Sequence, residues 1–244
     1  MGKRGAAAVI IGNEVLTAKV VEQNGAHLIR RLRERGVPLR SVQLVPDEID
    51  AIVEALTLAR RNARWVITSG GIGPTHDDVT VRAVAMALGR QVVRLASMEQ
   101  LIKDHYADRL SPEALRLADA PEGAELILQA GTWYPVLSCD GVFMLPGVPD
   151  LFRAQLEAVL ARVEGKPVFI KTLFVSDAEA DIAGVLDRVA LTMPEVSIGS
   201  YPTFNRAAGY KVMLTVEAAE ATPVEKAVGR LTAELPAGTI LRVE

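Results

Sequence analysis

The chain has 244 residues, 50% of them hydrophobic, which is enough for one large domain or two smaller domains with buried cores. The net charge of −3 gives no sign of a nucleic-acid surface, and the single cysteine, Cys139, excludes intrachain disulfides and multi-cysteine metal sites. The sequence has no run of about 18 apolar residues, so we expect no membrane span, and a cytoplasmic protein is the simplest expectation.

The N-terminus is basic and then apolar, as signal peptides are. Its apolar part ends after Ile11, at Gly12-Asn13-Glu14, which is too short for the hydrophobic region and cleavage site of such a peptide. We therefore expect a buried first strand here.

The segment from Ala6 to Gly89 alternates between apolar runs and amphipathic stretches. Strands are predicted at Ala6–Gly12, Leu39–Val45 and Arg64–Thr68. Each is followed by a predicted helix: one with Leu28, Ile29 and Leu32 on its buried face, one capped by Asp47, and one over Val79–Leu88. This repeated strand–helix order predicts a parallel sheet with helices on both faces.

The next segment is expected to complete this first domain. Surface helices are predicted at Ser97–Asp108 and Pro112–Leu117, and strands at Glu125–Leu128, Trp133–Ser138 and Val142–Leu145. Asp140-Gly141 lies between the last two strands and indicates a tight hairpin turn. A strong amphipathic helix follows from Pro149.

The segment Glu164–Pro167 is the most plausible linker and divides the chain into domains 1–165 and 166–244. The second domain has the predicted order β-α-β-β-α-β, which is typical of a ferredoxin-like or KH-like α+β fold. Its predicted elements are Val168–Val175, Ala178–Val189, Val196–Ser200, Tyr210–Val216, a helix that opens at Thr222-Pro223 and runs to Leu235, and Thr239–Val243.

The stretch Ser69-Gly-Gly-Ile-Gly-Pro-Thr-His-Asp-Asp-Val-Thr80 is the strongest functional signal. Gly70, Gly71 and Gly73 leave the backbone free to curl and to expose N–H groups, which favour anions. The stretch follows a predicted parallel strand, and ligands of open α/β sheets bind at the carboxyl ends of strands. The glycines alone also fit an ordinary tight strand–helix loop, and their spacing matches no nucleotide fingerprint.

Asp77 and Asp78 give this loop a second property. Carboxylates repel anions, so their presence beside N–H donors predicts a phosphate or pyrophosphate bridged by a divalent metal. Asp78 is the preferred metal ligand and Asp77 the second, while helix capping or solvation is the alternative for each. His76 is a candidate general acid or phosphate donor, or an ordinary polar contact. Thr75 is a candidate cap or phosphate contact, and so is Thr80.

Residues that follow or precede neighbouring elements are expected at the same edge of the sheet. Gly12 and Glu14 come directly after the first strand, and Glu22 and Asn24 lie at the start of the next helix. Glu14 and Glu22 are candidate metal ligands, and Gly12 and Asn24 are candidate contacts to substrate. Solvated residues at a helix start are the alternative interpretation.

The turn Pro146-Gly147-Val148-Pro149 also lies at the end of a predicted strand. Gly147 would let the backbone approach a ligand closely, and Pro149, the last residue of the turn, is a candidate contact to the same ligand. A purely structural turn is the alternative interpretation. Tyr201 is a candidate for stacking on a ring or a partly buried core residue. Cys139 lies in a turn without a histidine motif, so we expect no catalytic role.

Together these motifs resemble the molybdopterin-binding-like domain of the MoaB/Mog superfamily, and within it the CinA-type branch. The segments that carry this resemblance are Gly12-Asn-Glu14, Glu22-Gln-Asn24, Gly70–Thr80 and Leu145-Pro-Gly-Val-Pro149. Other segments are similar to the N-terminal, hydrolase-like domain of eukaryotic FAD synthases: Leu44–Glu48, Pro135–Ser138, Ile198–Pro202 and Leu231–Pro236.

The resemblance implies a three-layer α/β/α domain with a mostly parallel sheet, plus a small α+β domain, in a homo-oligomer. It also implies hydrolysis of a dinucleotide pyrophosphate such as ADP-ribose or FAD, with a divalent metal (Mg, Mn or Co) and potassium as cofactors. By motif, Asp78 matches the family's acidic residue after the glycine loop. Glu22 stands where the family has aspartate, which keeps the charge on a longer side chain.

Three hypotheses follow. The first is a metal-dependent nucleotide pyrophosphatase that acts on a dinucleotide. The second is a protein that binds or adenylylates molybdopterin, so that its small-molecule ligand is a pterin. The third is a scaffold in which the glycine motif survives as a loop. None of them involves nucleic acid or a membrane.

Overall fold

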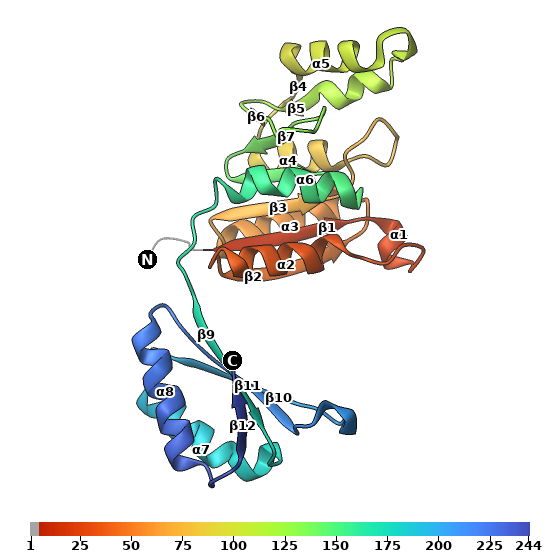
Figure 1. The fold of residues 1–244 in the computed structure, drawn as a ribbon. Coiled ribbons are helices and arrows are strands. Elements are labelled where there is room, and N and C mark those ends of the chain that lie inside the picture. The colour runs from red at the N-terminus through yellow and green to blue at the C-terminus, as the bar shows by residue number, and fades with distance from the viewer. Residues whose placement is uncertain (1–4) are drawn as a thin grey trace. The chain divides into compact units, whose positions relative to one another are not determined.

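The computed structural model describes residues 5–244, and the basic Lys3 and Arg4, which made the N-terminus similar to a signal peptide, lie outside them. The chain divides into two compact units, Met1–Gly165 and Lys166–Glu244, so the division falls inside the Glu164–Pro167 segment. Figure 1 shows the N-terminal unit in red to green and the C-terminal unit in teal to blue. Each unit is described by itself.

The N-terminal unit is built on a six-stranded sheet in the order β2-β1-β3-β8-β7-β6. The strands β1, β2, β3 and β8 are parallel, and β7 and β6 are antiparallel to their neighbours, which confirms a mostly parallel sheet. Their bounds are Ala6–Ile11 (β1), Leu39–Val45 (β2), Trp65–Ser69 (β3), Glu125–Ile127 (β6), Val136–Cys139 (β7) and Val142–Leu145 (β8). Every residue of β1, β3 and β8 is buried, as expected for central strands covered on both faces.

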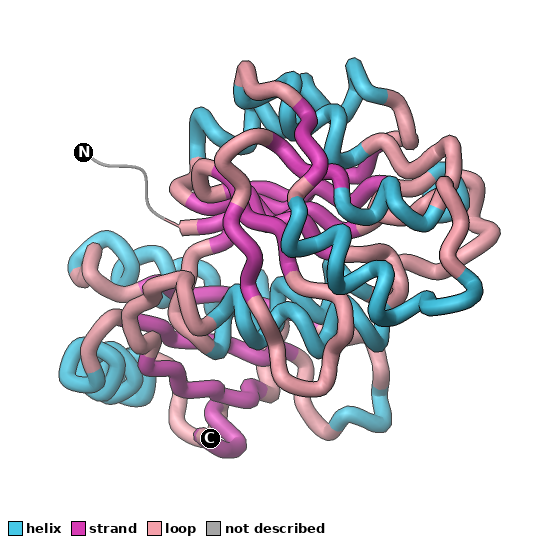
Figure 2. Tube along the Cα trace, turned by 90° about the horizontal axis from the view of Figure 1, so that it is seen from above, coloured by secondary structure: helices cyan, strands magenta, loops and turns pink. Residues whose placement is uncertain are grey.

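Helices cover both faces of this sheet, so the predicted three-layer α/β/α fold is confirmed (Figures 1 and 2). On one face, α2 (Asn24–Glu34) and α6 (Pro149–Leu160) pack on the sheet. On the other face lie α3 (Ile49–Asn62) and α4 (Thr80–Leu88). A short helix, α1 (Asn13–Leu16), follows β1.

Two details of the predicted helices are wrong. Ile29 is 46% exposed and does not join Leu28 and Leu32 in the core. In this part of α2 each turn buries only one residue. Asp47 does not cap α3, whose N-cap is Glu48; its carboxylate instead accepts the backbone N–H of Asn13 at 2.7 Å. Asp47 therefore ties the end of β2 to α1.

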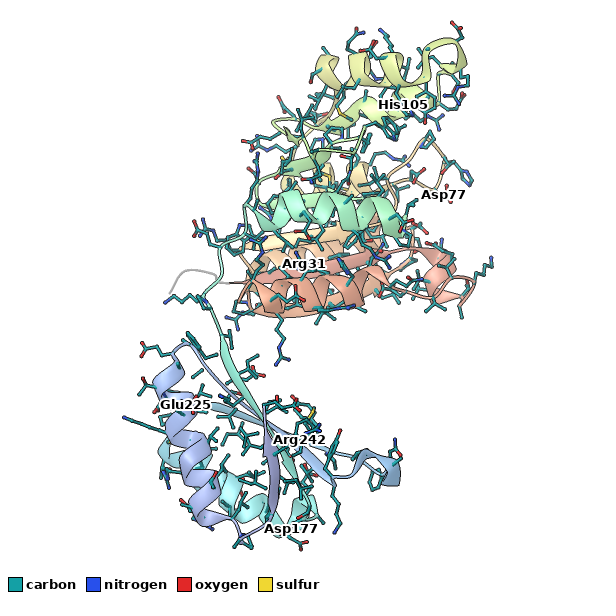
Figure 3. The ribbon with its side chains drawn as sticks, viewed as in Figure 1. Arg31, Asp77, His105, Asp177, Glu225 and Arg242 are labelled. Carbon is teal, nitrogen blue, oxygen red and sulfur yellow. The ribbon has the colours of Figure 1, made fainter. Side chains whose placement is uncertain are left out.

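The pair α2 and α6 is also joined by an ion pair. The guanidinium of Arg31 donates to both carboxylate oxygens of Glu157, with Nη2 at 2.8 Å from each, and hydrogen bonding to Glu157 and Glu34 raises the pKa of Arg31. In Figure 3, Arg31 lies where these two helices run side by side.

Residues 92–134 form a small subdomain with its own core. Its strands β4 (Val92–Arg94) and β5 (Asp119–Pro121) pair antiparallel, and the sequence analysis missed both because three-residue strands carry little pattern. The first predicted surface helix is α5 (Ala96–Tyr106), followed by a 3-10 turn, η1 (Ala107–Arg109), and the second is the 3-10 helix η2 (Ala114–Ala118). The core consists of Met98, Ile102, Ala114, Leu117, Ala118 and Tyr134.

The C-terminal unit is the predicted small α+β domain, with an antiparallel sheet in the ferredoxin-like order β10-β11-β9-β12. Its elements are β9 (Phe169–Val175), α7 (Glu179–Thr192), β10 (Ser197–Pro202), η3 (Arg206–Ala208), β11 (Val212–Ala218), α8 (Ala221–Glu234) and β12 (Ile240–Val243). Helices α7 and α8 share one core with the sheet. Helix α8 begins at Ala221, just before the predicted opening at Thr222-Pro223, and its N-cap is Glu220.

Among the described residues, no helix combines the length and the apolar character that crossing a bilayer requires.

The core of the N-terminal unit gives a direct stability test. Leu156 on α6 is fully buried, whereas Leu128 after β6 is 75% exposed. We expect Leu156→Ala to lower the free energy of unfolding by about 2–5 kcal/mol through the cavity it leaves, and Leu128→Ala to change it by less than about 0.5 kcal/mol. Both tryptophans, Trp65 and Trp133, belong to this unit, so fluorescence-detected urea unfolding reports on it alone. Equal effects of the two substitutions would contradict the packing described here.

Candidate functional site

The glycine loop, residues 70–79, leaves β3 against the backbone of two neighbouring strands. Gly70 adopts φ +102°, and its N–H donates to the carbonyl of Leu145 at the end of β8. A Cβ on Gly70 would lie 2.1 Å from the carbonyl oxygen of Ile11 at the end of β1. A side chain at this position would therefore push the ends of three strands apart.

The remaining glycines of the loop make room for side chains. A Cβ on Gly71 would lie 2.3 Å from Oγ1 of Thr80, and a Cβ on Gly73 would lie 2.4 Å from Oδ2 of Asp78. Thr80 is fully buried and donates to the carbonyl of Gly70 at 2.8 Å, so it holds the loop in place. Gly73 leaves the space that the Asp78 carboxylate occupies.

Three consecutive backbone N–H groups of the loop, those of Gly71, Ile72 and Gly73, have no acceptor within residues 5–244. All three residues line the same pocket. Gly70 does not share this role, because its N–H is used by Leu145. Successive free N–H groups in a curled backbone form an anion-binding concavity.

The two aspartates converge on Thr75. Its hydroxyl oxygen lies 2.6 Å from Oδ1 of Asp77 and 2.5 Å from Oδ2 of Asp78, and its N–H donates to the same Asp78 oxygen at 2.8 Å. One hydroxyl proton can serve only one carboxylate at a time. The loop therefore holds two carboxylate groups close together with one hydroxyl donor between them.

The predicted capping alternative for these aspartates is not what the structure has. The N-cap of α4 is Val79, with no side-chain cap. The hydrogen bond from Thr75 lowers the pKa of Asp77, and a bond to its own backbone N–H and the neighbouring His76 act in the same direction. Asp77 is therefore ionised at neutral pH. Figure 3 shows Asp77 on the loop between β3 and α4.

A pocket of about 430 Å³ opens beside this loop. One wall is the glycine loop with the start of α4, and the other comes from residues 92–134. It is lined by Gly71, Ile72, Gly73, Thr75, His76, Asp78, Val81, Arg82, Val92, Arg116, Leu117, Asp119 and Tyr134. We call it the glycine-loop pocket. Its volume lies within the range of small-molecule sites.

Two arginines in this pocket were missed by the sequence analysis. Arg82 lies in the first turn of α4, and no partner for its side chain is found among residues 5–244. Arg116 on η2 donates to the carbonyl of Pro74 at 3.3 Å and so joins the 92–134 subdomain to the glycine loop. Neither residue is part of a sequence motif. Each reaches the pocket only because of the fold.

Tyr134 and Asp119 close the far side of the pocket. The hydroxyl of Tyr134 donates to the carbonyl of Leu117, and burial raises its pKa, with the charges of Asp78 and Asp119 adding to the effect. Asp119 is paired with Arg94 at 2.9 Å. The pocket thus carries carboxylates near Tyr134 and guanidinium groups at its wall.

His76 is a lining residue whose side chain is 95% exposed, with Nδ1 at 3.9 Å from Asp77. It is placed where it could reach a bound ligand.

The other predicted site residues lie outside this pocket. Asn24 is buried and donates to the hydroxyl of Ser69 and to the carbonyl of Gly147, so it joins α2 to the ends of β3 and β8. Pro149 is the first residue of α6. Gly147 approaches Gly70, with a hypothetical Cβ 3.4 Å from the Gly70 Cα. These residues support the edge of the sheet.

Gly12, Glu14 and Glu22 do not join the aspartates. Gly12 and Glu14 stay beside each other at α1, where the Glu14 carboxylate folds back over Gly12. Oε1 of Glu22 accepts the N–H of Gly25 at 2.7 Å and so satisfies a donor at the start of α2. No group of three His, Cys, Asp or Glu side chains able to hold a metal is found within residues 5–244.

The donor set nevertheless fits one kind of cation. Magnesium binds through one or two carboxylates and completes its shell with water and substrate phosphates. Asp77 and Asp78, which share the single Thr75 hydroxyl, supply that number of carboxylates, and Gly73 provides the space for Asp78. The assignment of a metal to these residues stays a prediction.

Comparison with known proteins decides the family. Residues 7–165 match the family model described as probable molybdopterin binding domain. The chain belongs to this family. Residues 167–244 match a second model, the FAD synthase middle domain. The predicted resemblance to the molybdopterin-binding-like domain and to FAD synthases is thereby confirmed.

Individual relatives of this molybdopterin-binding-domain protein span nearly its whole length. A protein of Archaeoglobus fulgidus is 30% identical, covering 90% of this chain and 93% of its own. Protein TK1472 of Thermococcus kodakarensis is 33% identical, with 91% and 94% covered. The crystal structure of the protein CinA from Thermoplasma acidophilum, described as of unknown function, is 32% identical with a TM-score of 0.61, and covers 66% of this chain and 98% of its own. The CinA-type likeness is thus also structural.

Within this family member, the shared hydroxyl can be tested directly. We expect Thr75→Val to raise the pKa of Asp77, because the hydrogen bond that stabilises its charged form is removed. Carbon-13 NMR titration of the aspartate carboxyls measures this. As a control, Thr17→Val removes a hydroxyl that bonds only the carbonyl of Asn13, and it should leave Asp77 unchanged. An unshifted Asp77 in Thr75→Val would contradict the geometry given above.

Proposed function

We propose that this protein is a metal-dependent nucleotide pyrophosphatase that hydrolyses the phosphoanhydride of ADP-ribose, FAD or a similar dinucleotide. The observation that carries the proposal is the composition of the glycine-loop pocket. It places free N–H groups and two arginines, which favour phosphates, beside two carboxylates that share one hydroxyl. Anion-binding and cation-binding groups are both useful in one pocket when the ligand is a metal-bound polyphosphate.

In this proposal, the phosphate-binding residues and the metal-binding residues have separate roles. The N–H groups of Gly71, Ile72 and Gly73 hold one phosphate of the pyrophosphate, and Arg82 and Arg116 hold its remaining charge. Asp78, with Asp77, would hold a divalent metal (Mg, Mn or Co). That metal supplies Lewis-acid polarisation of the phosphate oxygens when bound.

The protein otherwise positions the reactants. Thr75 fixes both carboxylates through its hydroxyl and its N–H, so the geometry is set before substrate arrives. His76, exposed beside the pocket, is positioned to protonate the leaving phosphate oxygen. Attack of water on one phosphorus and cleavage of the bridging P–O bond release two phosphomonoesters.

A second candidate function is binding or adenylylation of molybdopterin. The family match to a probable molybdopterin binding domain over residues 7–165 favours it. The two functions differ in what a pure protein does to a dinucleotide. Tight pterin binding without hydrolysis of any dinucleotide, or ATP consumption that depends on the pterin, would support the second. A homo-oligomeric state, a cytoplasmic location and a role for potassium stay predictions.

Asp78 is the central test of the first function. We expect Asp78→Asn to reduce kcat for ADP-ribose and FAD hydrolysis by about 100-fold or more, because a metal ligand and its charge are lost. Chromatography of products with magnesium, manganese or cobalt, with and without chelator, measures this. Asp50→Asn, which changes an exposed aspartate on α3, is the control and should retain full activity. Equal rates for Asp78→Asn and wild type, with unchanged metal dependence, would exclude the assignment.

Arg116 tests the phosphate-binding wall. We expect Arg116→Gln to raise KM for ADP-ribose about tenfold with a smaller change in kcat, since one charge-assisted hydrogen bond to substrate is lost. Arg109→Gln removes an exposed arginine from the adjacent η1 turn and serves as the matched control. The same KM in both variants would remove Arg116 from the substrate site.

A further inference from the structure

A second pocket, of about 460 Å³, lies between α2 and α6. It is lined by Glu22, Gln23, Ala26, His27, Arg30 and Arg153, and we call it the basic cleft. It shares no lining residue with the glycine-loop pocket. Because α2 and α6 cover one face of the sheet and α4 covers the other, the two pockets are separate sites.

Positive charge dominates the basic cleft. Within residues 5–244, the side chain of Arg30 has no hydrogen bond or ion pair. Arg153 donates to the side-chain oxygen of Gln23 at 3.1 Å and lies 3.6 Å from Asp150, whose side chain is 96% exposed and therefore screened by water. The carboxylate of Glu22 is already engaged at the N–H of Gly25. Two guanidinium groups and the Glu22 carboxylate thus line the cleft, so positively charged groups outnumber negatively charged ones there.

His27 lies one helical turn from both Gln23 and Arg30, on the stripe of α2 that lines the cleft. Burial lowers its pKa, and the positive charges of Arg153, Arg30 and Arg31 lower it further. Glu157 acts in the opposite direction, but its carboxylate is held by Arg31. An anion in the cleft would offset these charges and favour the protonated imidazole.

The donors match a tetrahedral dianion. Two arginines can neutralise two negative charges and donate several N–H groups, and His27 adds one more donor. The volume exceeds that of a bare oxyanion, whose size is comparable to a few water molecules at about 30 Å³ each. The cleft therefore has room for a phosphate group with an organic group attached.

We propose that the basic cleft binds a phosphomonoester, a mononucleotide or a sugar phosphate, with its phosphate between Arg30 and Arg153. The site is independent of the glycine-loop pocket and does not rest on the function proposed for that pocket. Helix α2, which lines the basic cleft, also carries Asn24. The Asn24 side chain donates to Ser69 and Gly147 at the sheet edge, so the same helix supports the glycine loop.

The three histidines of the chain make the test selective. His27 lines the basic cleft, His76 lines the glycine-loop pocket, and His105 stacks on Trp133 in the 92–134 subdomain. NMR of the histidine rings, assigned with His76→Gln and His105→Gln, follows each site in one sample. Inorganic phosphate, AMP and adenosine are titrated at constant ionic strength, because surface charges respond to salt alone.

We expect saturable shifts of the His27 resonances and an increase in the pKa of His27 with phosphate and with AMP, and no change with adenosine. Tighter binding of AMP than of phosphate would identify the nucleotide as the source of the phosphate group, and equal binding would identify the free anion. Arg30→Gln and Arg153→Gln should each weaken binding at His27 about tenfold, the value of one charge-assisted hydrogen bond. Arg35→Gln, which changes an exposed arginine at the end of the same helix, should leave it unchanged.

Three results would overturn the proposal. The first is a shift at His76 alone, which would confine phosphate to the glycine-loop pocket. The second is equal affinity in the Arg30, Arg153 and Arg35 variants. The third is a His27 response to adenosine as large as the response to AMP. Each variant replaces an exposed side chain, and circular dichroism verifies that the fold is retained.

Discussion

The candidate site depends on a backbone contact between the ends of three parallel strands. The N–H of Gly70 bonds the carbonyl of Leu145, and the Gly70 Cα lies so close to the carbonyl of Ile11 that no side chain fits between them. Gly147 approaches the same glycine from β8. Because these contacts involve backbone atoms, they are rigid, and they fix the direction in which the glycine loop leaves the sheet. The loop is thus held at its base and open at its tip.

This anchoring explains the unusual combination of groups at the tip. Backbone N–H groups normally find partners, yet those of Gly71, Ile72 and Gly73, three half-buried residues that line the pocket, have no acceptor in the described chain. Nearby, Thr75 holds Asp77 and Asp78 on one hydroxyl. The N–H donors by themselves disfavour cations, and the carboxylates by themselves disfavour anions. A phosphate that arrives with a cation satisfies both, which is the physical basis of the proposed function.

Residues outside the glycine loop add positive charge to its pocket. The 92–134 subdomain brings Arg116 to the loop, and α4 brings Arg82 into the same pocket. On the opposite face, α2 and α6 gather Arg30, Arg153 and His27 in a separate cleft. The chain is acidic in sum, with a net charge of −3, so both clusters are local concentrations of positive charge. Composition alone does not reveal either cluster, while the fold supplies two places where anions are favoured.

The sequence by itself determined the repeated strand–helix order of the first unit, the βαββαβ order of the second, and the glycine–Asp-Asp loop at the end of β3. These features follow from local periodicity and from glycine, and they do not depend on distant contacts. Tertiary structure alone decided which side chains share a pocket. Arg82, Arg116 and Tyr134 carry no motif; Arg82 reaches the pocket from α4, and Arg116 and Tyr134 reach it from residues 92–134. Tertiary structure also gave Asn24 its partner, the carbonyl of Gly147 at the sheet edge, whereas Glu22 accepts the N–H of Gly25 only three residues along the chain.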